Sequence, residues 1–257
     1  SFFEQSVGQE RTDKIFDETP VTATSTFASR MQSLIMPPER RWFDFEIVVE
    51  MDNADKRAYK LSLQKVRDIL WRQIKRSNLS TQSSELFLDI AIGTAAMMCE
   101  MDALGRIVYK AMPLPLIAID EGPDGHVGGL FRKRTAMSLQ DIMIKYPDAD
   151  LSQLTTGKPD DNFGAKFTLN EATVRDYSDE RKIAYDWVVW VQGKDLILDQ
   201  KKYTGPGSCP VIATRWSSTA EEWYGRGPLI DLLPAIRGVN LIRELIYENA
   251  EWAITGL

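Results

Sequence analysis

A helical pattern of apolar residues between positions 22 and 35 is the first feature of the chain. A spacing of three and four places apolar side chains on one face of a helix, and the residues with this spacing are Phe27, Met31, Leu34 and Ile35. The Pro37-Pro38 pair ends the helix, because proline lacks a backbone donor and disfavours helical angles in the residue before it. Alternating apolar positions from Trp42 to Val49 then predict a strand.

A second long helix is predicted for residues 53–76. Its apolar stripe consists of Leu63, Val66, Leu70 and Ile74. A face of this helix crowded with basic side chains either lies in solvent or faces a phosphate backbone. Solvent is the favoured interpretation, because single charged faces are common on surface helices. The basic residues are Lys56, Arg57, Lys60, Lys65, Arg67, Arg72, Lys75 and Arg76.

The middle of the chain predicts short strands and hairpins, separated by turn-forming residues. Leu139, Ile142 and Met143 are expected to face inward from a short helix. Residues 167–174 are either part of a flexible insertion or an edge strand. In chain order the predictions are a polar break at 77–84, a helix or a helix then a strand at 85–100, a strand pair at 112–120 and 127–134, the short helix at 138–146, a strand pair at 183–191 and 196–198, and a strand at 211–216.

The longest apolar stripe lies near the end of the chain and predicts a helix over residues 229–255. Pro228 suits its first position, where the missing donor costs nothing. Pro234 and Gly238 predict a kink or a break in its early part. Long helices that flank antiparallel hairpins indicate an α+β fold. The stripe consists of Leu232, Ile236, Val239, Ile242, Ile246, Ala250 and Ala253.

Composition limits the classes of protein to which the chain can belong. Of 257 residues, 44% are hydrophobic, which suffices for one large domain or two small ones. A net charge of −6 argues against indiscriminate attraction to nucleic acid or anionic lipid. Two distant cysteines, Cys99 and Cys209, favour a reducing compartment. No apolar run reaches the roughly 18–20 residues of a membrane-spanning helix, so no membrane association is expected.

The two ends of the sequence predict that the chain is a piece of a longer protein. Its start has neither an initiator Met nor the basic and apolar segments of a signal peptide, and it stops directly after a helical pattern.

Few residues of the chain suit catalysis or metal binding. His126 is the single histidine, so any catalytic triad or multi-histidine site would have to use it. It lies in a Gly-Pro-Asp-Gly-His turn and is predicted to be a solvated loop residue. Met97, Met98 and Cys99 are predicted to fill the core, because no partner ligand stands at suitable spacing. Neither a metal nor a cofactor is expected.

The most specific motif lies between residues 210 and 240. Gly225 and Gly227 are expected to adopt backbone angles that other residues avoid, which would place Arg226 at the start of a helix. Its guanidinium could pair with an acid of its own chain, such as Asp231 or Glu222, with a carboxylate of a neighbouring subunit, or less favourably with DNA phosphate. The motif consists of Pro-Val-Ile-Ala-Thr-Arg-Trp (210–216), Trp-Tyr-Gly-Arg-Gly-Pro (223–228) and Leu-Pro-Ala-Ile-Arg-Gly-Val-Asn (233–240).

These motifs resemble the portal proteins, or head-to-tail connectors, of short-tailed bacteriophages. Two further similarities fall in the expected order: a helix followed by Met36-Pro37-Pro38 and Trp42-Phe43, and Pro113-Leu114 followed by the Asp124-Gly125 hairpin. The resemblance covers nearly the whole chain. It implies a structural or subunit- or DNA-contacting role for the motif residues Arg215, Trp216, Tyr224, Gly225, Arg226, Gly227, Pro228 and Asn240.

The resemblance also implies an architecture and a set of partners. It implies a non-enzymatic virion protein that forms a homo-oligomeric ring, typically a dodecamer, through which double-stranded DNA is packaged and ejected. The expected partners are the large terminase subunit, tail adaptor or head-completion proteins, the major capsid and scaffolding proteins, and DNA bound without sequence preference. The expected location is the portal vertex of the capsid, after assembly in the host cytoplasm.

Three regions of wing, stem and clip type are expected along the chain. Residues 1–110 would form a helical wing-like region, 111–216 a β-rich hairpin region, and 217–257 the beginning of a long helical region that continues beyond the chain.

Two other classes of function remain open at this point. A hydrolase would use paired carboxylates, either Asp148 with Asp150 or Asp160 with Asp161, although clustered acids in such a stretch are usually solvated. A monomeric binding module, for instance for carbohydrate, is suggested by seven tryptophans. Five of them lie in apolar patterns and are predicted to be core residues: Trp42, Trp71, Trp187, Trp190 and Trp216.

Overall fold

The computed structural model describes residues 15–50, 52–102, 104–123, 127–154, 164–178, 182–218 and 222–256. Within them the chain is a mixed helix and antiparallel-sheet protein, so the predicted α+β class is confirmed. The helices are α1 (Thr19–Ile35), α2 (Asn53–Arg76), α3 (Leu79–Ile92), α4 (Leu139–Lys145) and α5 (Pro228–Thr255), with one 3₁₀ turn, η1 (Leu114–Leu116). The strands are β1 (Thr94–Met101), β2 (Ile107–Met112), β3 (Ile117–Glu121), β4 (Val127–Ser138), β5 (Lys166–Asp176), β6 (Ala184–Val191), β7 (Ile197–Thr204) and β8 (Val211–Arg215).

Two sheets make up the β region. The smaller sheet has the strand order β2-β1-β8, and the larger sheet has the order β3-β4-β5-β6-β7. All the pairings are antiparallel, including the predicted hairpins of β3 with β4 and of β6 with β7. Strand β8 pairs with β1 although more than a hundred residues separate them, so the end of the β region returns to its beginning.

Strand β1 is buried on both faces, and this explains its run of small and flexible side chains. Ala96 and Met98 face a core between the two sheets, which also includes Leu139 and Ile142 of α4. Ala95 and Met97, on the opposite face, contact a second core formed with α1 and α3. A strand with period-two alternation and two buried faces must be apolar throughout. The prediction that the methionine pair fills the core is therefore confirmed.

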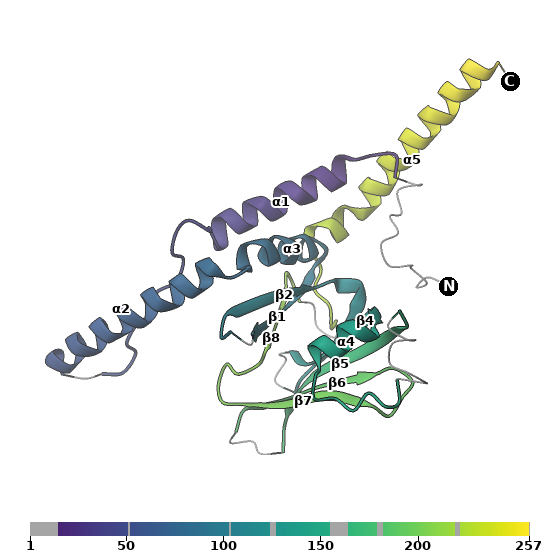
Figure 1. Cartoon of the computed structure of the whole chain (residues 1–257). Helices are drawn as coiled ribbons and strands as arrows, with labels where there is room; N and C mark the ends of the chain where they lie inside the picture. The colour runs from purple at the N-terminus through teal and green to yellow at the C-terminus, as the bar shows by residue number, and fades with distance from the viewer. Residues whose placement is uncertain are drawn as a thin grey trace.

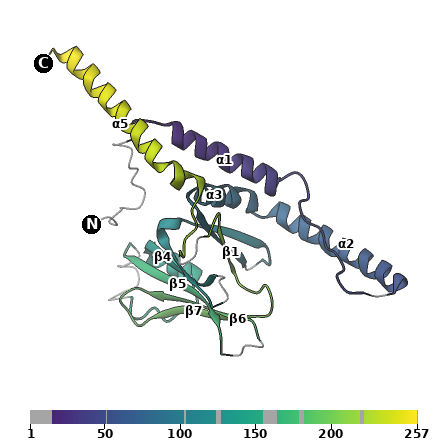
Figure 2. The same ribbon diagram turned by 180° about the vertical axis from the view of Figure 1, so that it is seen from behind.

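The molecule is layered, with two helices projecting from it. Helices α1 and α3 cover the smaller sheet, and the larger sheet lies on the other side of that sheet (Figure 1). Helix α2 and the far half of α5 leave this body in opposite directions, as both ribbon views show (Figure 2). At 1.5 Å per residue, the 28 residues of α5 span about 42 Å.

Several helical predictions are confirmed, and others need correction. Helix α2 has the predicted bounds, and α4 is capped by the Ser138 side chain, which accepts a hydrogen bond from the Asp141 amide. Leu34 and Ile35 do not face the core: they are 79% and 49% exposed, because α1 turns Ala28 inward instead. Met143 of α4 is likewise exposed. The polar break is shorter than predicted, because α3 begins at Leu79.

Two strand predictions were wrong in a related way. Residues 42–49 form no strand, because their aromatic side chains pack on helix α2 instead of pairing with another strand. The ring of Phe43 lies 6.2 Å from that of Trp71 and 5.2 Å from that of Trp42. Strand β5, predicted as an insertion or an edge strand, is the central strand of the larger sheet. Local pattern cannot tell which strands find partners on both sides.

Helix α5 is continuous through Pro234, so the predicted break is absent, while the alternative, a kink, stays a prediction. A proline removes a single backbone donor, and the turns on either side continue the helix. Strand β8 follows the prediction for residues 211–216 closely. The three-region division of the chain stays a prediction, and two features cross its boundary at residue 110: β2 spans it, and β8 pairs with β1.

Candidate functional site

Three glycines come together where β8 leads into α5. Gly93 ends α3, while Gly225 and Gly227 precede α5, and we call these three residues the glycine contact. A Cβ atom added to Gly225 would lie 2.3 Å from the Gly93 carbonyl oxygen, and one added to Gly227 would lie 2.4 Å from the Ala91 carbonyl oxygen. Side chains cannot approach backbone so closely, so glycine is required here by contact.

The expected reason for Gly225 and Gly227, an unusual backbone angle, was therefore wrong. Neither has a positive φ, and Gly227 has an ordinary extended conformation with φ −100° and ψ 170°. The positive φ belongs to Gly93, at +141°, where the chain leaves α3. Sequence alone cannot show this, because the glycine partner lies more than a hundred residues away.

Hydrogen bonds join the glycine contact to the end of α3. The Gly227 amide donates to the Ile92 carbonyl at 2.8 Å, and the Trp216 amide donates to the Gly93 carbonyl at 2.8 Å. The Gly225 amide donates to Thr94 Oγ1 at 2.7 Å. The last carbonyls of a helix have no partner within it, and the loop supplies donors for two of them. The loop thereby fixes the start of α5 against α3 and β1.

Arg226 pairs with an acid of its own chain, Glu222, one of the two partners named from the sequence. Arg226 Nε donates to Glu222 Oε2 at 2.9 Å, with a second contact between Nη2 and Oε1, and this pairing raises the pKa of Arg226. Arg215 Nη1 donates to Glu121 Oε2 at 3.3 Å and contacts the Glu222 carbonyl. Whether Arg226 also contacts a neighbouring subunit or DNA stays a prediction.

The two aromatic motif residues tie the same loop to other elements. Trp216 is 46% exposed, so its predicted place in the core was wrong; its ring packs edge-on against Phe27 of α1, with centroids 5.5 Å apart. The Tyr224 hydroxyl donates to the Ile117 carbonyl of β3 at 3.4 Å. Pro228 is the first residue of α5, as predicted.

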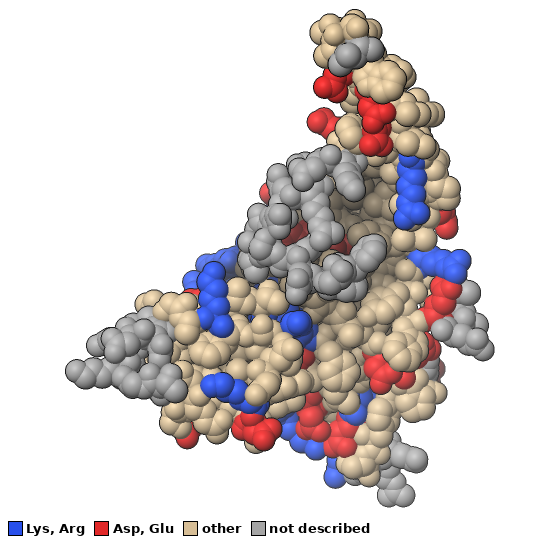
Figure 3. Space-filling view, turned by 90° about the vertical axis from the view of Figure 1, so that its right-hand side faces the viewer, with Lys and Arg blue, Asp and Glu red and all other residues tan. Residues whose placement is uncertain are grey.

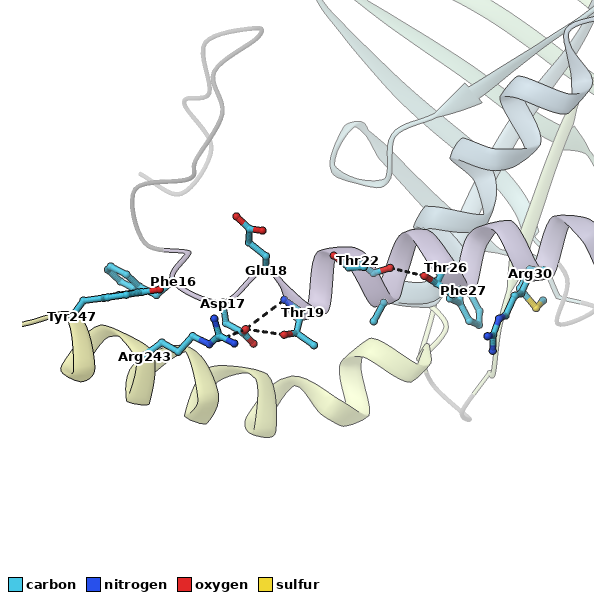
Figure 4. Close-up of a pocket in the computed structure, with 12 residues that line it drawn as sticks. Phe16, Asp17, Glu18, Thr19, Thr22, Thr26, Phe27, Arg30, Arg243 and Tyr247 are labelled. Atoms are coloured by element: carbon cyan, nitrogen blue, oxygen red, sulfur yellow. Dashed lines mark hydrogen bonds and ion pairs between the residues drawn. The ribbon is translucent and has the colours of Figure 1, made fainter. Parts of the chain in front are cut away.

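Asn240 attaches the start of α1 to the middle of α5. Its Oδ1 accepts hydrogen bonds from the amides of Phe16 at 2.8 Å and Asp17 at 3.2 Å. Arg243, one turn further along α5, forms an ion pair of 3.1 Å with the buried carboxylate of Asp17. Figure 4 shows Arg243 directed at Asp17 along an open groove of about 930 Å³ between the two helices. The motif residue Asn240 thus joins two helices that are distant in sequence.

A buried cluster of charges, which the sequence analysis missed, lies on the inner face of the larger sheet. Glu171 is 2% exposed and accepts a hydrogen bond from Trp187 Nε1 at 2.8 Å. Its carboxylate lies 3.3 Å from Arg134 Nε and 3.9 Å from Arg132 Nη1. Nearby, burial and then the charge of Arg134 lower the pKa of Lys145 to about 8. One feature of the sequence could have revealed this cluster: Arg132 and Arg134 are two residues apart, so both side chains lie on the same face of β4.

The residues proposed for hydrolysis form no constellation in the part of the chain that the structure describes. Asp148 and Asp150 are exposed, and Asp150 accepts a hydrogen bond from the Ser152 amide in a turn. His126, Asp160 and Asp161 lie outside the described residues. No three His, Cys, Asp or Glu side chains within the described ranges are grouped closely enough to hold a metal ion. Nor does any helix within those ranges have the length and apolar character needed to cross a bilayer.

The tryptophans do not form a shared binding surface either. Of the five predicted to be core residues, Trp187 is buried, whereas Trp42 and Trp216 are exposed. Trp42 and Trp71 flank Phe43, so intrachain ring contacts already occupy parts of their faces.

Helices α2 and α5 expose an unusual amount of apolar surface. No described residue of either helix is buried, and the stripe on α5 lies open: Leu232 is 55%, Ile242 59% and Ile246 58% exposed. The accessible surface of the chain is 18094 Å². A compact monomer of 29.2 kDa would expose about 11,500 Å². The excess surface and the open apolar stripe are typical of a subunit that packs against other molecules.

The fold and the site thus define a structural subunit. Two of its helices project from the body, and its motif residues form hydrogen bonds and ion pairs within the chain. A family model described as bacteriophage head to tail connecting protein matches residues 1–257. The chain belongs to this family, and the resemblance to phage portal proteins is confirmed. It is a structural connector of the phage virion that acts with other head and tail proteins, a family role that is normally non-enzymatic. No curated protein matches the chain.

Proposed function

We propose that this chain assembles into a closed ring of identical subunits, typically a dodecamer, at one vertex of the phage capsid. Double-stranded DNA would pass through the ring during packaging and ejection. The ring would dock the large terminase subunit during packaging and tail adaptor or head-completion proteins afterwards, with major capsid and scaffolding proteins around it. Assembly would take place in the host cytoplasm.

The observation that carries this proposal is the exposed surface of the two projecting helices. Neither helix has a buried residue among those described, and Leu232, Ile242 and Ile246 of the α5 stripe are 55%, 59% and 58% exposed. Burial of apolar surface stabilises association by about 25 cal/mol per Å². Packing between copies would therefore remove from water a stripe that the single chain leaves open.

Net acidity fits passage of DNA through such a ring. Each Lys or Arg that contacts a phosphate adds a counterion-release contribution to the affinity, so a strongly basic wall would hold DNA in place. A chain with a net charge of −6 would let the duplex slide.

The mass of the purified chain in solution tests the proposal. Light scattering should give a mass many times 29.2 kDa, and negative-stain images should show rings with an open centre. A second sample at tenfold lower concentration would separate a stable ring from loose association. A mass of one chain at every concentration would contradict the proposed assembly.

A further inference from the structure

The two projecting helices differ in charge as well as in direction. Helix α2 has eight Lys and Arg against two Asp, a net charge of +6 within a chain whose net charge is −6. Helix α5 has no Lys or Arg after Arg243, but it has Glu244, Glu248 and Glu251 there. Helix α2 is therefore basic, and the far half of α5 is acidic.

The basic charges on α2 are available for a partner. Lys56, Arg57, Lys60, Lys65 and Arg76 are exposed and form no ion pair with any described residue, whereas other cations of this helix pair with acids of the chain. Leu61, Lys65, Ile69 and Arg76 follow one another at spacings of four, four and seven, which places them on one helical face. Leu61 is 56% and Ile69 51% exposed. The free surface of α2 is therefore both basic and apolar.

The far half of α5 is the counterpart of this surface. Leu241, Leu245, Glu248 and Trp252 follow one another at spacings of four, three and four, which places them on one helical face. The three apolar residues are 54%, 48% and 67% exposed, respectively. The three glutamates of this half have no ion pair with any described residue. Figure 3 shows acidic side chains beside uncharged surface on this projecting end.

We propose that the acidic, apolar face of α5 in one copy packs against the basic, apolar face of α2 in the next copy. The inference rests on the proposed ring and names its subunit contact. Because the two helices leave the body in opposite directions, they cannot meet within one chain (Figures 1 and 2). A contact between two different surfaces of identical subunits is head-to-tail, and it closes into a ring when the rotation permits.

A second copy fits α2 better than a DNA backbone does. Phosphate would pair with Lys65 and Arg76 but would leave Leu61 and Ile69 in water. A protein helix with apolar residues between its carboxylates would cover both kinds of side chain. Opposite charges across such an interface also set its register and speed association.

Charge reversal tests the contact. The double variant Lys65→Glu/Arg76→Glu, or the double variant Glu248→Lys/Glu251→Lys, should each weaken ring assembly by about tenfold or more, because attraction becomes repulsion. All four changes in one chain should restore assembly towards the wild-type level. The matched control is Lys133→Glu/Lys166→Glu, which reverses two exposed charges on the larger sheet and should leave assembly unchanged. Far-UV circular dichroism verifies that each variant is folded.

A crosslink provides an independent measurement. Lys65→Cys/Glu248→Cys should give a ladder of covalent multimers on mild oxidation, whereas Lys133→Cys/Glu248→Cys should not. Intact rings with either charge-reversal pair, or no ladder from wild-type-like rings, would overturn the contact but leave the ring itself standing. Absence of rings from the wild-type chain would instead refute the proposed function, and this contact with it. Loss of DNA retention by intact Lys65→Glu/Arg76→Glu rings would assign α2 to DNA.

Discussion

Single residues of the loop before α5 act through close backbone approach. Gly93, Gly225 and Gly227 let the end of α3 and the beginning of α5 approach within hydrogen-bond distance. A side chain at any of them would push apart the two segments that position α5. At Gly225 and Gly227 the effect of a substitution therefore depends on the opposing backbone, whereas at Gly93 the positive φ adds backbone strain to the close contact.

Gly227→Ala is expected to lower the free energy of unfolding by about 2–4 kcal/mol, because the new Cβ would overlap the backbone of Ala91 and Ile92. Urea unfolding followed by circular dichroism measures the change. Gly238→Ala is the matched control within α5. A Cβ atom added to Gly238 has no other atom within 4 Å, and alanine favours a helix. The Gly238→Ala change should therefore stabilise the chain by about 0.5–1 kcal/mol. Equal effects of the two changes would contradict the contact argument.

Asn240→Ala is expected to free the start of α1. The change removes the acceptor for two amides, those of Phe16 and Asp17, at a cost of about 1–2 kcal/mol. Hydrogen exchange at these two amides should become faster, while exchange in the larger sheet stays as it was. Asn249→Ala provides the comparison, because the Asn249 side chain bonds only to the carbonyl of Leu245 in its own helix. Unchanged exchange at Phe16 and Asp17 would rule out this role for Asn240.

At the scale of elements, the charge at the end of helix α4 lies near the buried charges of the larger sheet. Lys145 ends α4, and Arg134 and Glu171 stand on β4 and β5. Burial lowers the pKa of Lys145 to about 8, so the folded state binds its proton less tightly than the unfolded state, whose lysine has a pKa of about 10.4. The packing of α4 on the sheet is thereby coupled to pH.

The sign of this coupling can be measured. Between about pH 8 and 10 the unfolded state holds a proton on Lys145 that the folded state has released, so this lysine makes stability rise with pH. Lys145→Met removes that rise. The free energy of unfolding of the wild type minus that of the variant should therefore increase from pH 7.5 to pH 10, and other titrating groups cancel in the difference. A difference that stays flat over this range would show that Lys145 is solvated.

The elements also show the limit of pattern analysis. The bounds of α2 and the course of β8 follow from local periodicity, because the spacing of apolar side chains is a property of the segment itself. The aromatic segment from Trp42 to Val49 has the alternation of a strand but lacks a partner strand, so its rings pack on α2. Strand β5 lacks a clear pattern and yet lies at the centre of a sheet, since β4 and β6 supply partners on both sides.

At the scale of the whole molecule, the chain exposes apolar surface of the kind that is typical of a subunit that packs against other molecules. Its two projecting helices contain no described residue that is buried, and they carry opposite charge at opposite ends. Apolar faces exposed to this extent favour aggregation of a monomer, whereas in a subunit they can be buried against another molecule. The compact layers in between hold the motif residues, which brace the origin of α5 and its link to α1. These layers thus set the directions in which the two projecting helices point.

The sequence by itself determined the α+β class, most of the helices, the two hairpins and the family resemblance through the Tyr-Gly-Arg-Gly-Pro motif. These depend on the order of residues over short stretches, where spacing dictates which side chains share a face. The tertiary structure alone decided that Gly227 meets Ala91, that Asn240 holds Phe16 and Asp17, and that Glu171 is buried with two arginines. Each of these is a contact between segments distant in the chain or in different strands, and local periodicity carries no information about which surfaces will meet.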